Sequence, residues 1–285
     1  MPEPPASADP GPGTCIPTTR AVILARGLGT RMRAADADAS LDVAQAAAAD
    51  TGVKGMIPIG RPFLDYVLSA LADAGIRDVC LVIGPEHHAV REHYAALPTT
   101  RLRVHFAVQE RPLGTADAVA AARDFAGSDT VLVLNSDNYY PVPAYRLLAA
   151  LGGSGLVGFE RDALVAEGNI PEARIRTFAL VTHGPSGLLT AIAEKPDEAT
   201  HARMAPHALV SMNLWSFTPA IFEACRRVRP SVRGELELQD AVRIAIEELG
   251  ERFQVIPYRG GVLDLSSRRD VAAVAERLAG TPVAL

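Results

Sequence analysis

A short apolar run that ends in a glycine-rich turn constrains the fold of this chain more than any other feature. Residues 21–25 read Ala-Val-Ile-Leu-Ala, a run typical of a parallel strand buried on both faces. Gly27 and Gly29 follow, and glycines leave backbone N–H groups uncovered, as a phosphate chain requires. The next cation, Arg31, suits a polyphosphate. The segment predicts a nucleotide triphosphate site, although a plain tight turn accounts for the same residues.

Two better-known glycine loops do not match this turn. The dinucleotide fingerprint G-x-G-x-x-G needs a third glycine where this chain has Met32. The Walker A motif G-x-x-x-x-G-K-[ST] occurs nowhere in the sequence. A nicotinamide-dependent dehydrogenase is therefore disfavoured, and so is a P-loop enzyme.

The pattern after the turn predicts an α/β fold. Further strands are expected at residues 79–84, 103–109 and 130–134, and helices at residues 64–75, 86–97 and 114–125. Strands that alternate with helices at this spacing form a doubly wound, mainly parallel, Rossmann-like sheet with helices on both faces. Ligands in such sheets bind beyond the carboxyl ends of the strands.

The second half of the chain is less regular. Strands are expected at residues 155–159, 177–182, 188–194, 208–217 and 253–257, and helices at 219–228, 239–249 and 269–278. No linker separates the halves, so one domain is expected over residues 20–285. A disordered tail is expected at residues 1–19, and a mobile, partly helical flap at residues 33–51.

Composition excludes several classes of protein. A net charge of −5 argues against a general nucleic-acid binder, and no apolar run is long enough to span a membrane. Cys15, Cys80 and Cys225 are too scattered for a disulfide framework or a zinc site. The N-terminus lacks the basic and apolar regions of a signal peptide. We expect a cytoplasmic protein, and the sequence leaves open whether it forms a homo-oligomer.

Polar residues at strand ends are the candidates for chemistry. Asp137 follows four apolar strand residues and Asp264 follows Gly-Val-Leu. A carboxylate at such a position is costly unless it meets a metal or a substrate. Glu194 and Lys195 place an acid beside a base at another strand end, where a surface ion pair is an equal alternative. Gln109 offers the acceptor and donor that the imide edge of uracil or thymine needs, although an amide bonded to backbone is equally compatible.

The order of these motifs carries a resemblance that no single one does. The series LARGLGTRM, VKGMIPIGRPFLDYVL, QERPLGTADA, VLVLNSDN, AEKPDE, SMNLWSF, RGELELQDA and GVLDLSSRRD resembles the sugar-1-phosphate nucleotidyltransferases, the nucleoside-diphosphate-sugar pyrophosphorylases. The resemblance covers about residues 20–275. It implies transfer of a nucleotidyl group from an NTP to a sugar 1-phosphate with the help of Mg²⁺. The nucleophile is already an oxyanion, so alignment and charge stabilisation are expected to suffice.

The resemblance also implies a role for each matching residue. Residues 20–150 would form the nucleotide-binding half and residues 151–285 the sugar-phosphate-binding half. Catalytic cations would be Arg31, Lys54 and Lys195. Nucleotide-binding residues would be Ala25, Gly27, Gly29, Thr30, Gln109, Gly114 and Thr115. Sugar-phosphate-binding residues would be Asn138, Glu194, Lys195 and Asn213. Magnesium ligands would be Asp137 and Asp264.

Some features depart from the family pattern. Arg26 replaces the small residue usual before the first glycine, and the segment 33–51 lengthens the gap before Lys54. Gln109 favours UTP or dTTP as the nucleotide, and glucose 1-phosphate is the expected sugar. Two alternatives stay open: a regulatory protein of the same fold that binds nucleotides without catalysis, and a cytidylyltransferase for a non-sugar phosphate.

Overall fold

A computed structural model describes residues 17–204 and 207–285. Most of the expected tail, residues 1–16, lies outside the described residues. Thr18 is buried and its N–H donates to the carbonyl of Ala149 at 2.8 Å. The ordered core therefore begins before residue 20.

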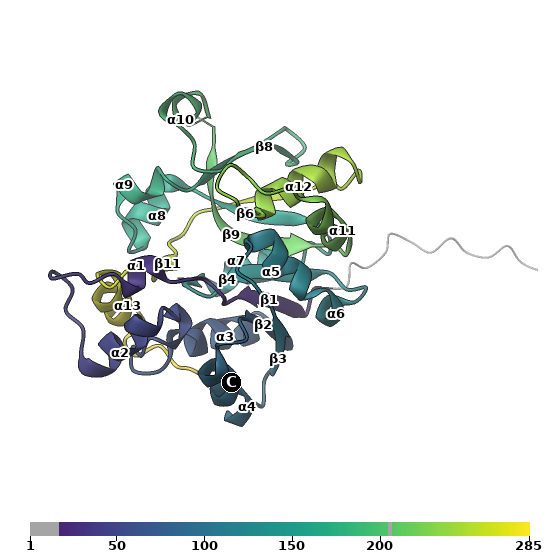
Figure 1. The fold of residues 1–285 in the computed structure, drawn as a ribbon. Coiled ribbons are helices and arrows are strands. Elements are labelled where there is room, and N and C mark those ends of the chain that lie inside the picture. The colour runs from purple at the N-terminus through teal and green to yellow at the C-terminus, as the bar shows by residue number, and fades with distance from the viewer. Residues whose placement is uncertain (1–16, 205–206) are drawn as a thin grey trace, which may run out of the picture.

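A mixed sheet forms the centre of the fold (Figure 1). Its strands are β1 (Arg20–Leu24), β2 (Asp78–Ile83), β3 (Arg103–Val108), β4 (Val131–Asn135), β6 (Gly155–Phe159), β7 (Ala179–His183), β8 (Leu189–Ala193), β9 (Leu209–Phe217) and β10 (Gln254–Tyr258). The main order is β10-β6-β9-β4-β1-β2-β3, with β7 and β8 attached beside β9. A separate small ribbon pairs β5 (Asn138–Tyr139) with β11 (Leu263–Asp264).

The strand order places a switch point at β1. The chain runs from β1 to β2 and β3 on one side, and then β4 pairs with β1 on the other, all in parallel. In doubly wound sheets ligands bind at this kind of reversal. Strand β9 runs antiparallel to both β4 and β6, so the sheet is mixed but mainly parallel, as the sequence predicts.

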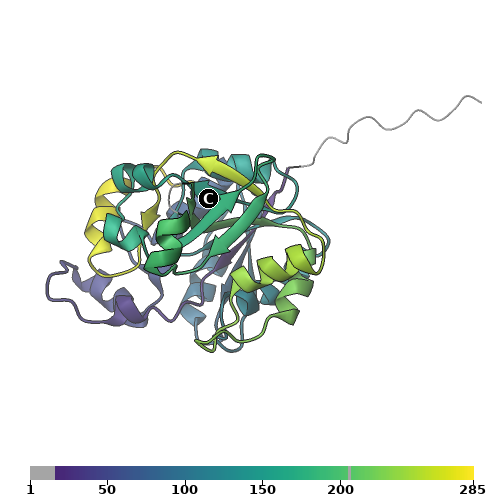
Figure 2. The same cartoon turned by 90° about the horizontal axis from the view of Figure 1, so that it is seen from above.

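Helices cover both faces of the sheet (Figures 1 and 2). They are α1 (Thr30–Arg33), α2 (Val43–Thr51), the 3-10 helix η1 (Lys54–Met56), α3 (Phe63–Asp73), α4 (His88–Ala96), α5 (Thr115–Ala121), α6 (Arg123–Ala126), α7 (Val142–Ala149), α8 (Arg161–Glu167), α9 (Glu172–Ile175), α10 (Glu198–Met204), α11 (Ala220–Arg227), α12 (Leu238–Glu247) and α13 (Asp270–Leu278). Side chains of α3, α4, α7 and α13 fill one apolar core, and those of α5, α11 and α12 fill the other. Each core buries the apolar side chains of one face of the strands.

The sequence predictions fail mainly in short elements. The single helix expected at residues 114–125 is divided at Ala122 into α5 and α6. Helices α7 to α10 were not expected, because each has only four to eight residues, too few to show a helical period. Residues 33–51 contain α2, whose first turn is capped by the side chain of Asp42. Cys80 and Cys225 are free and buried, as expected, whereas Cys15 lies outside the described residues. No helix in the described ranges is long and apolar enough to cross a bilayer.

Candidate active site

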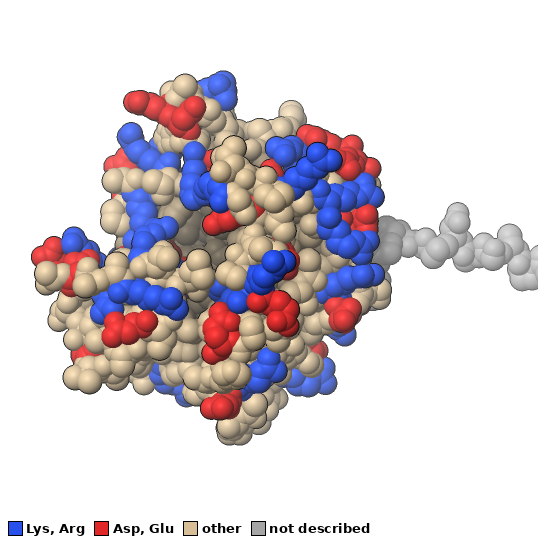
Figure 3. All heavy atoms as spheres, in the orientation of Figure 1, with Lys and Arg blue, Asp and Glu red and all other residues tan. Residues whose placement is uncertain are grey.

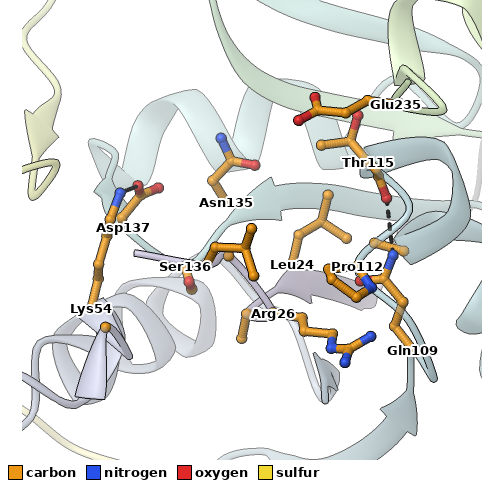
Figure 4. Close-up of a pocket in the computed structure, with 16 residues that line it drawn as sticks. Leu24, Arg26, Lys54, Gln109, Pro112, Thr115, Asn135, Ser136, Asp137 and Glu235 are labelled. Carbon is orange, nitrogen blue, oxygen red and sulfur yellow. Dashed lines mark hydrogen bonds and ion pairs between the residues drawn. The ribbon is translucent and has the colours of Figure 1, made fainter. Parts of the chain in front are cut away.

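A well-formed cleft lies where the carboxyl ends of β1 and β4 meet. Its volume is about 280 Å³, and Figure 3 shows a hollow with charged residues around its rim. The lining comes from the glycine turn, η1, the β3–α5 loop and the end of β4. Figure 4 places Lys54 and Asp137 at one end of the cleft, and Gln109 and Pro112 at the other. The cleft thus lies at the edge of the sheet where ligands bind in folds of this kind.

Lys54 and Asp137 form an ion pair at the first end of the cleft. Lys54 Nζ donates to Asp137 Oδ2 at 2.8 Å, and the two side chains are 19% and 20% exposed. The rigid one-turn helix η1 carries Lys54, and Asp137 lies two residues beyond β4. The two charges therefore lie side by side at the carboxyl edge of the sheet.

Gln109 closes the other end of the cleft and is almost fully buried. Its Nε2 donates to the carbonyl of Gly114 at 3.0 Å and to Asp117 Oδ2 at 2.8 Å. Both partners are acceptors, so the amide nitrogen must occupy this position. Gly114 has φ +129°, and a Cβ atom there would lie 2.4 Å from the carbonyl oxygen of Leu236. Only glycine allows the segment around Leu236 to pack this closely on the β3–α5 loop.

A second cavity of about 150 Å³ adjoins the first. Leu24, Thr115, Asn135 and Glu235 line both cavities. The second cavity is also lined by Glu194, Lys195, Asn213, Arg233, Glu237 and Gln239. Because the cavities share these residues, two molecules bound in them would be direct neighbours.

Lys195 and Asn213 hold strained backbone conformations beside the second cavity. They are the two non-glycine residues with positive φ in the described part of the chain, at +43° and +58°. Such conformations cost about 1–3 kcal/mol each and concentrate at functional sites. The strain supports a binding role for both residues.

Asn213 lies in an irregular stretch of β9. Residues 209–211 pair with β7 and residues 215–217 pair with β4, while residues 212–214 lie outside both registers. Ser211 pairs with Gly158 of β6 and Trp215 pairs with Leu156, so β9 has two more residues than β6 between these pairs. The two extra residues form a bulge, a feature that redirects side chains next to active sites.

The second cavity gathers carboxylates around its cations. Burial raises the pKa of the Glu194 carboxyl, and the nearby charge of Glu237 raises it further. Gln239 Nε2 donates to Glu194 Oε2 at 3.0 Å, and Arg233 pairs with Glu237 at 2.9 Å. The cavity thus offers carboxylate acceptors for hydroxyl groups and cations for a phosphate.

Asp264 lies beside Asp137 but deeper in the protein. The N–H of Leu265 donates to the carbonyl of Asp137 at 2.8 Å, which joins the two segments. The Asp264 carboxylate accepts from Asn138 Nδ2 at 3.1 Å and from Ser266 Oγ at 2.9 Å, and it pairs with Arg174 at 3.2 Å. Burial raises the pKa of Asp264 to about 6, and the charge of Asp137 adds to the rise.

The carboxylate chemistry fits a hard divalent cation only in part. Asp137 and Asp264 are suitable oxygen ligands for Mg²⁺, and the effect of Asp137 on the Asp264 pKa shows that their charges interact. Across residues 17–204 and 207–285, however, no group of three or more His, Cys, Asp or Glu side chains could hold a metal ion. Phosphate oxygens of a nucleotide would have to complete such a site.

The structure brings most of the predicted site residues together. Ala25, Gly27, Lys54, Gln109, Gly114, Thr115 and Asp137 line the first cavity, and Glu194, Lys195 and Asn213 line the second. Five predicted residues line neither cavity: Gly29, Thr30, Arg31, Asn138 and Asp264.

The residues outside the lining have identifiable environments. Gly29 packs on Gly52, where a Cβ atom would lie 2.2 Å from the Gly52 carbonyl oxygen. Asn138 is buried and holds Asp264. Arg31 is exposed and forms no hydrogen bond or ion pair with any other residue that the structure describes.

Three residues near the two cavities had no role assigned from the sequence. Arg26 lies at the Gln109 end of the cleft (Figure 4), and its Nη2 pairs with Glu86 at 3.3 Å. It does not lie beside the Lys54–Asp137 pair. Arg233 and Glu235 line the second cavity, and the motif RGELELQDA contained the signal for both, although it gave no specific role to either.

Comparisons with known proteins relate the chain to nucleotidyl transferases. A family model described as nucleotidyl transferase matches residues 20–260. The chain is 30% identical over 270 residues to the UTP–glucose-1-phosphate uridylyltransferase AglF of Haloferax volcanii, a match that covers 91% of this chain and 96% of AglF.

Other relatives are longer, or similar only in fold. The chain is 31% identical over 229 residues to a glucose-1-phosphate thymidylyltransferase of Streptomyces griseus, which covers 80% of this chain but 57% of that protein. The chain is also 28% identical to the nucleotidyltransferase Agl11 of Haloferax volcanii. That match covers 80% of this chain and 57% of Agl11. A structure of UDP-glucose pyrophosphorylase complexed with UDP-glucose superposes with a TM-score of 0.70 at 17% identity, over 93% of this chain and 100% of that one.

Proposed function

Because the chain belongs to the nucleotidyl transferase family, we propose that it condenses an NTP with a sugar 1-phosphate to an NDP-sugar and pyrophosphate. The observation that carries this proposal is the pair of adjoining cavities, each with a lysine in its lining. A transfer between two phosphorylated substrates needs two neighbouring sites and cations that reduce the repulsion between them. At 4 Å that repulsion is about 1 kcal/mol between unit charges in water and more in a closed site.

The NTP occupies the larger cavity in this proposal, and the sugar 1-phosphate occupies the smaller one. An oxygen of the sugar phosphate attacks the α-phosphorus, and the bond from that phosphorus to the oxygen bridging the β-phosphate breaks. Pyrophosphate leaves with the bonding electron pair. Lys54 and Lys195 stabilise the charge of the phosphates on either side of the reacting atom.

The lysines themselves support this assignment. Lys54 and Lys195 are the only lysines in a chain that holds 28 Lys and Arg residues, and both line the cavities. Lysine presents a compact ammonium on a flexible stem, whereas arginine presents a planar fork. A small cation is what a crowded reaction centre between two phosphates can accommodate.

The Gln109 amide supports a uracil or thymine base. Its nitrogen is committed to Gly114 and Asp117, which leaves the oxygen to accept a hydrogen bond from the nucleotide. Uracil and thymine carry an N3–H donor, whereas N3 of cytosine is an acceptor. UTP and dTTP are therefore the proposed nucleotides, and CTP is disfavoured.

Mg²⁺ is the proposed cofactor, held by Asp137 and Asp264. It would supply charge neutralisation to the phosphate oxygens. Lys54 donates to one oxygen of Asp137, and its ammonium would move to the phosphates when they bind.

A substrate panel tests the whole proposal. UTP, dTTP, CTP, ATP and GTP are each combined with several sugar 1-phosphates, and pyrophosphate release is followed with Mg²⁺ and with EDTA. We expect release with UTP or dTTP and glucose 1-phosphate, and none in EDTA. Nucleotide binding without pyrophosphate release in any combination would contradict catalysis, and release with a non-sugar phosphate alone would contradict the sugar.

A further inference from the structure

We propose that Arg268 is a positioning residue that fixes the phosphate loop, residues 27–33, relative to the carboxylates of the active site. This inference rests on the proposed function. It concerns the segment from Asp264 to Asp270, here called the clasp, which lies more than 200 residues from the loop in sequence.

The first observation is the contact between Arg268 and the end of α1. Arg268 Nε donates to the carbonyl of Met32 at 2.8 Å, and Nη2 lies 3.4 Å from the carbonyl of Arg33. The same guanidinium pairs with Asp50 of α2. Its side chain is only 13% exposed, so these bonds are shielded from water.

Helix α1 needs such a partner. It has four residues and no side-chain cap, and a single turn of helix is unstable by itself. Its last carbonyls have no partner within the helix, and Arg268 supplies donors to two of them. The buried side chain of Met32 anchors the turn below. Without Arg268 the carbonyl end of α1 loses its only side-chain donor among the residues that the structure describes.

The second observation is that hydrogen bonds and ion pairs hold the clasp at both ends. The Asp270 carboxylate accepts from the N–H groups of Ser266 and Ser267, at 3.1 and 2.7 Å, and from Ser267 Oγ at 2.9 Å. Arg174 Nη1 donates to both oxygens of Asp270 at 3.0 Å and its Nη2 pairs with Asp264. One buried guanidinium thus ties together both ends of the clasp.

The two observations connect the loop to the reaction centre. The clasp begins at Asp264, and the N–H of the next residue, Leu265, donates to the carbonyl of Asp137. Arg268 lies four residues after Asp264 in the same clasp. The phosphate loop, whose Gly27 lines the first cavity, is therefore held at a set distance from Asp137. Figure 2 shows the purple segment that contains α1 and α2 at the same end of the molecule as the yellow helix α13. A misplacement of about 1 Å at such a site can cost about 100-fold in rate.

Arg269 provides a matched control. It pairs with Asp36 and Asp38 of the inserted segment, but its side chain is 60% exposed and, among the described residues, it forms no hydrogen bond or ion pair with α1. Exposed ion pairs contribute little. Removal of Arg269 changes the charge of the protein as much as removal of Arg268 does, yet leaves the loop anchored.

The experiment compares Arg268→Ala, Arg269→Ala and Arg268→Lys with wild type, through pyrophosphate release and calorimetric binding of the NTP. For Arg268→Ala we expect kcat/KM for the NTP to fall about 30-fold, roughly 2 kcal/mol, while KM for the sugar phosphate stays within about twofold. We expect Arg269→Ala to match wild type within about twofold, and Arg268→Lys, with one donor group in place of the fork, to recover part of the loss.

Two outcomes overturn the inference: Arg268→Ala behaving like Arg269→Ala, or equal losses for both substrates together with a lower melting temperature, which is the result for a purely structural role. Failure of the proposed function looks different. Wild type would then bind the NTP but release no pyrophosphate, and the calorimetric affinities of the two alanine variants would still test the positioning role.

Discussion

The ammonium of Lys54 lies 2.8 Å from a carboxylate oxygen of Asp137, with both side chains about four-fifths buried. The proposed catalytic cation and a proposed metal ligand therefore neutralise each other. Removing either partner leaves the other charge partly buried and unpaired.

Replacing Asp137 should separate catalysis from folding. We expect Asp137→Asn to keep the fold and to lower turnover by about two orders of magnitude, the scale of losing one preorganised charge partner. Asp124→Asn, at an exposed position in α6, is the control and should have wild-type rates. Wild-type pyrophosphate release from folded Asp137→Asn protein would refute the role of Asp137.

Lys195 should act on the second substrate. We expect Lys195→Ala to lower turnover by about two orders of magnitude and to raise KM for the sugar phosphate, with KM for the NTP little changed. Lys195→Arg should not restore the rate, because the guanidinium fork does not fit a site for one small cation. The two variants are measured in parallel, and full activity of Lys195→Arg would show that charge alone matters.

Gln109 should set the preference for the base. Gln109→Ala removes the acceptor for N3–H, so we expect the ratio of kcat/KM for UTP over CTP to fall by about 10- to 100-fold, or about 1–3 kcal/mol. The loss should appear in the UTP value and leave the CTP value nearly unchanged. An unchanged ratio would mean that another group reads the base.

Glu194 should make stability depend on pH. Burial and Glu237 raise its pKa, so the native state keeps a proton that the unfolded state loses. The stability from this group is present below the ordinary glutamate pKa of about 4.3 and is lost as pH rises through the higher native value. We therefore expect Glu194→Gln to gain in free energy of unfolding over wild type as pH rises through this window. Denaturant melts measure the difference, with exposed Glu198→Gln as a control that stays constant; a constant difference for Glu194→Gln would contradict the raised pKa.

Sequence reasoning found the sheet because its signals are local. The strands near residues 20–24, 78–83, 103–108 and 131–135 are apolar runs between turns, and their parallel order follows from the helices between them. Gln109, Asp137 and Lys195 each stand at or just after a strand end, so the same pattern that gave the strand also gave the residue.

The rest depends on contacts between distant segments. No local pattern shows that Arg268 reaches the carbonyl of Met32, or that Arg26 turns to Glu86 and away from the Lys54–Asp137 pair. The bulge at Asn213 interrupts a run that reads as one continuous strand. The segment 33–51 has weak apolar periodicity, so its sequence suggested mobility, whereas Arg268 and Arg269 bind it through Asp50, Asp36 and Asp38.

The scarcity of lysine has a practical consequence. Reagents that acylate primary amines, including those used to attach proteins to beads, dyes or sensor chips, would find ε-amino groups at Lys54 and Lys195 alone. If both lysines act as proposed, these reagents would inactivate this protein while they leave most other proteins active. Attachment through an added tag avoids modification of these lysines. Conversely, the fraction of Lys54 and Lys195 that a bound substrate protects from acylation would measure how many sites are occupied.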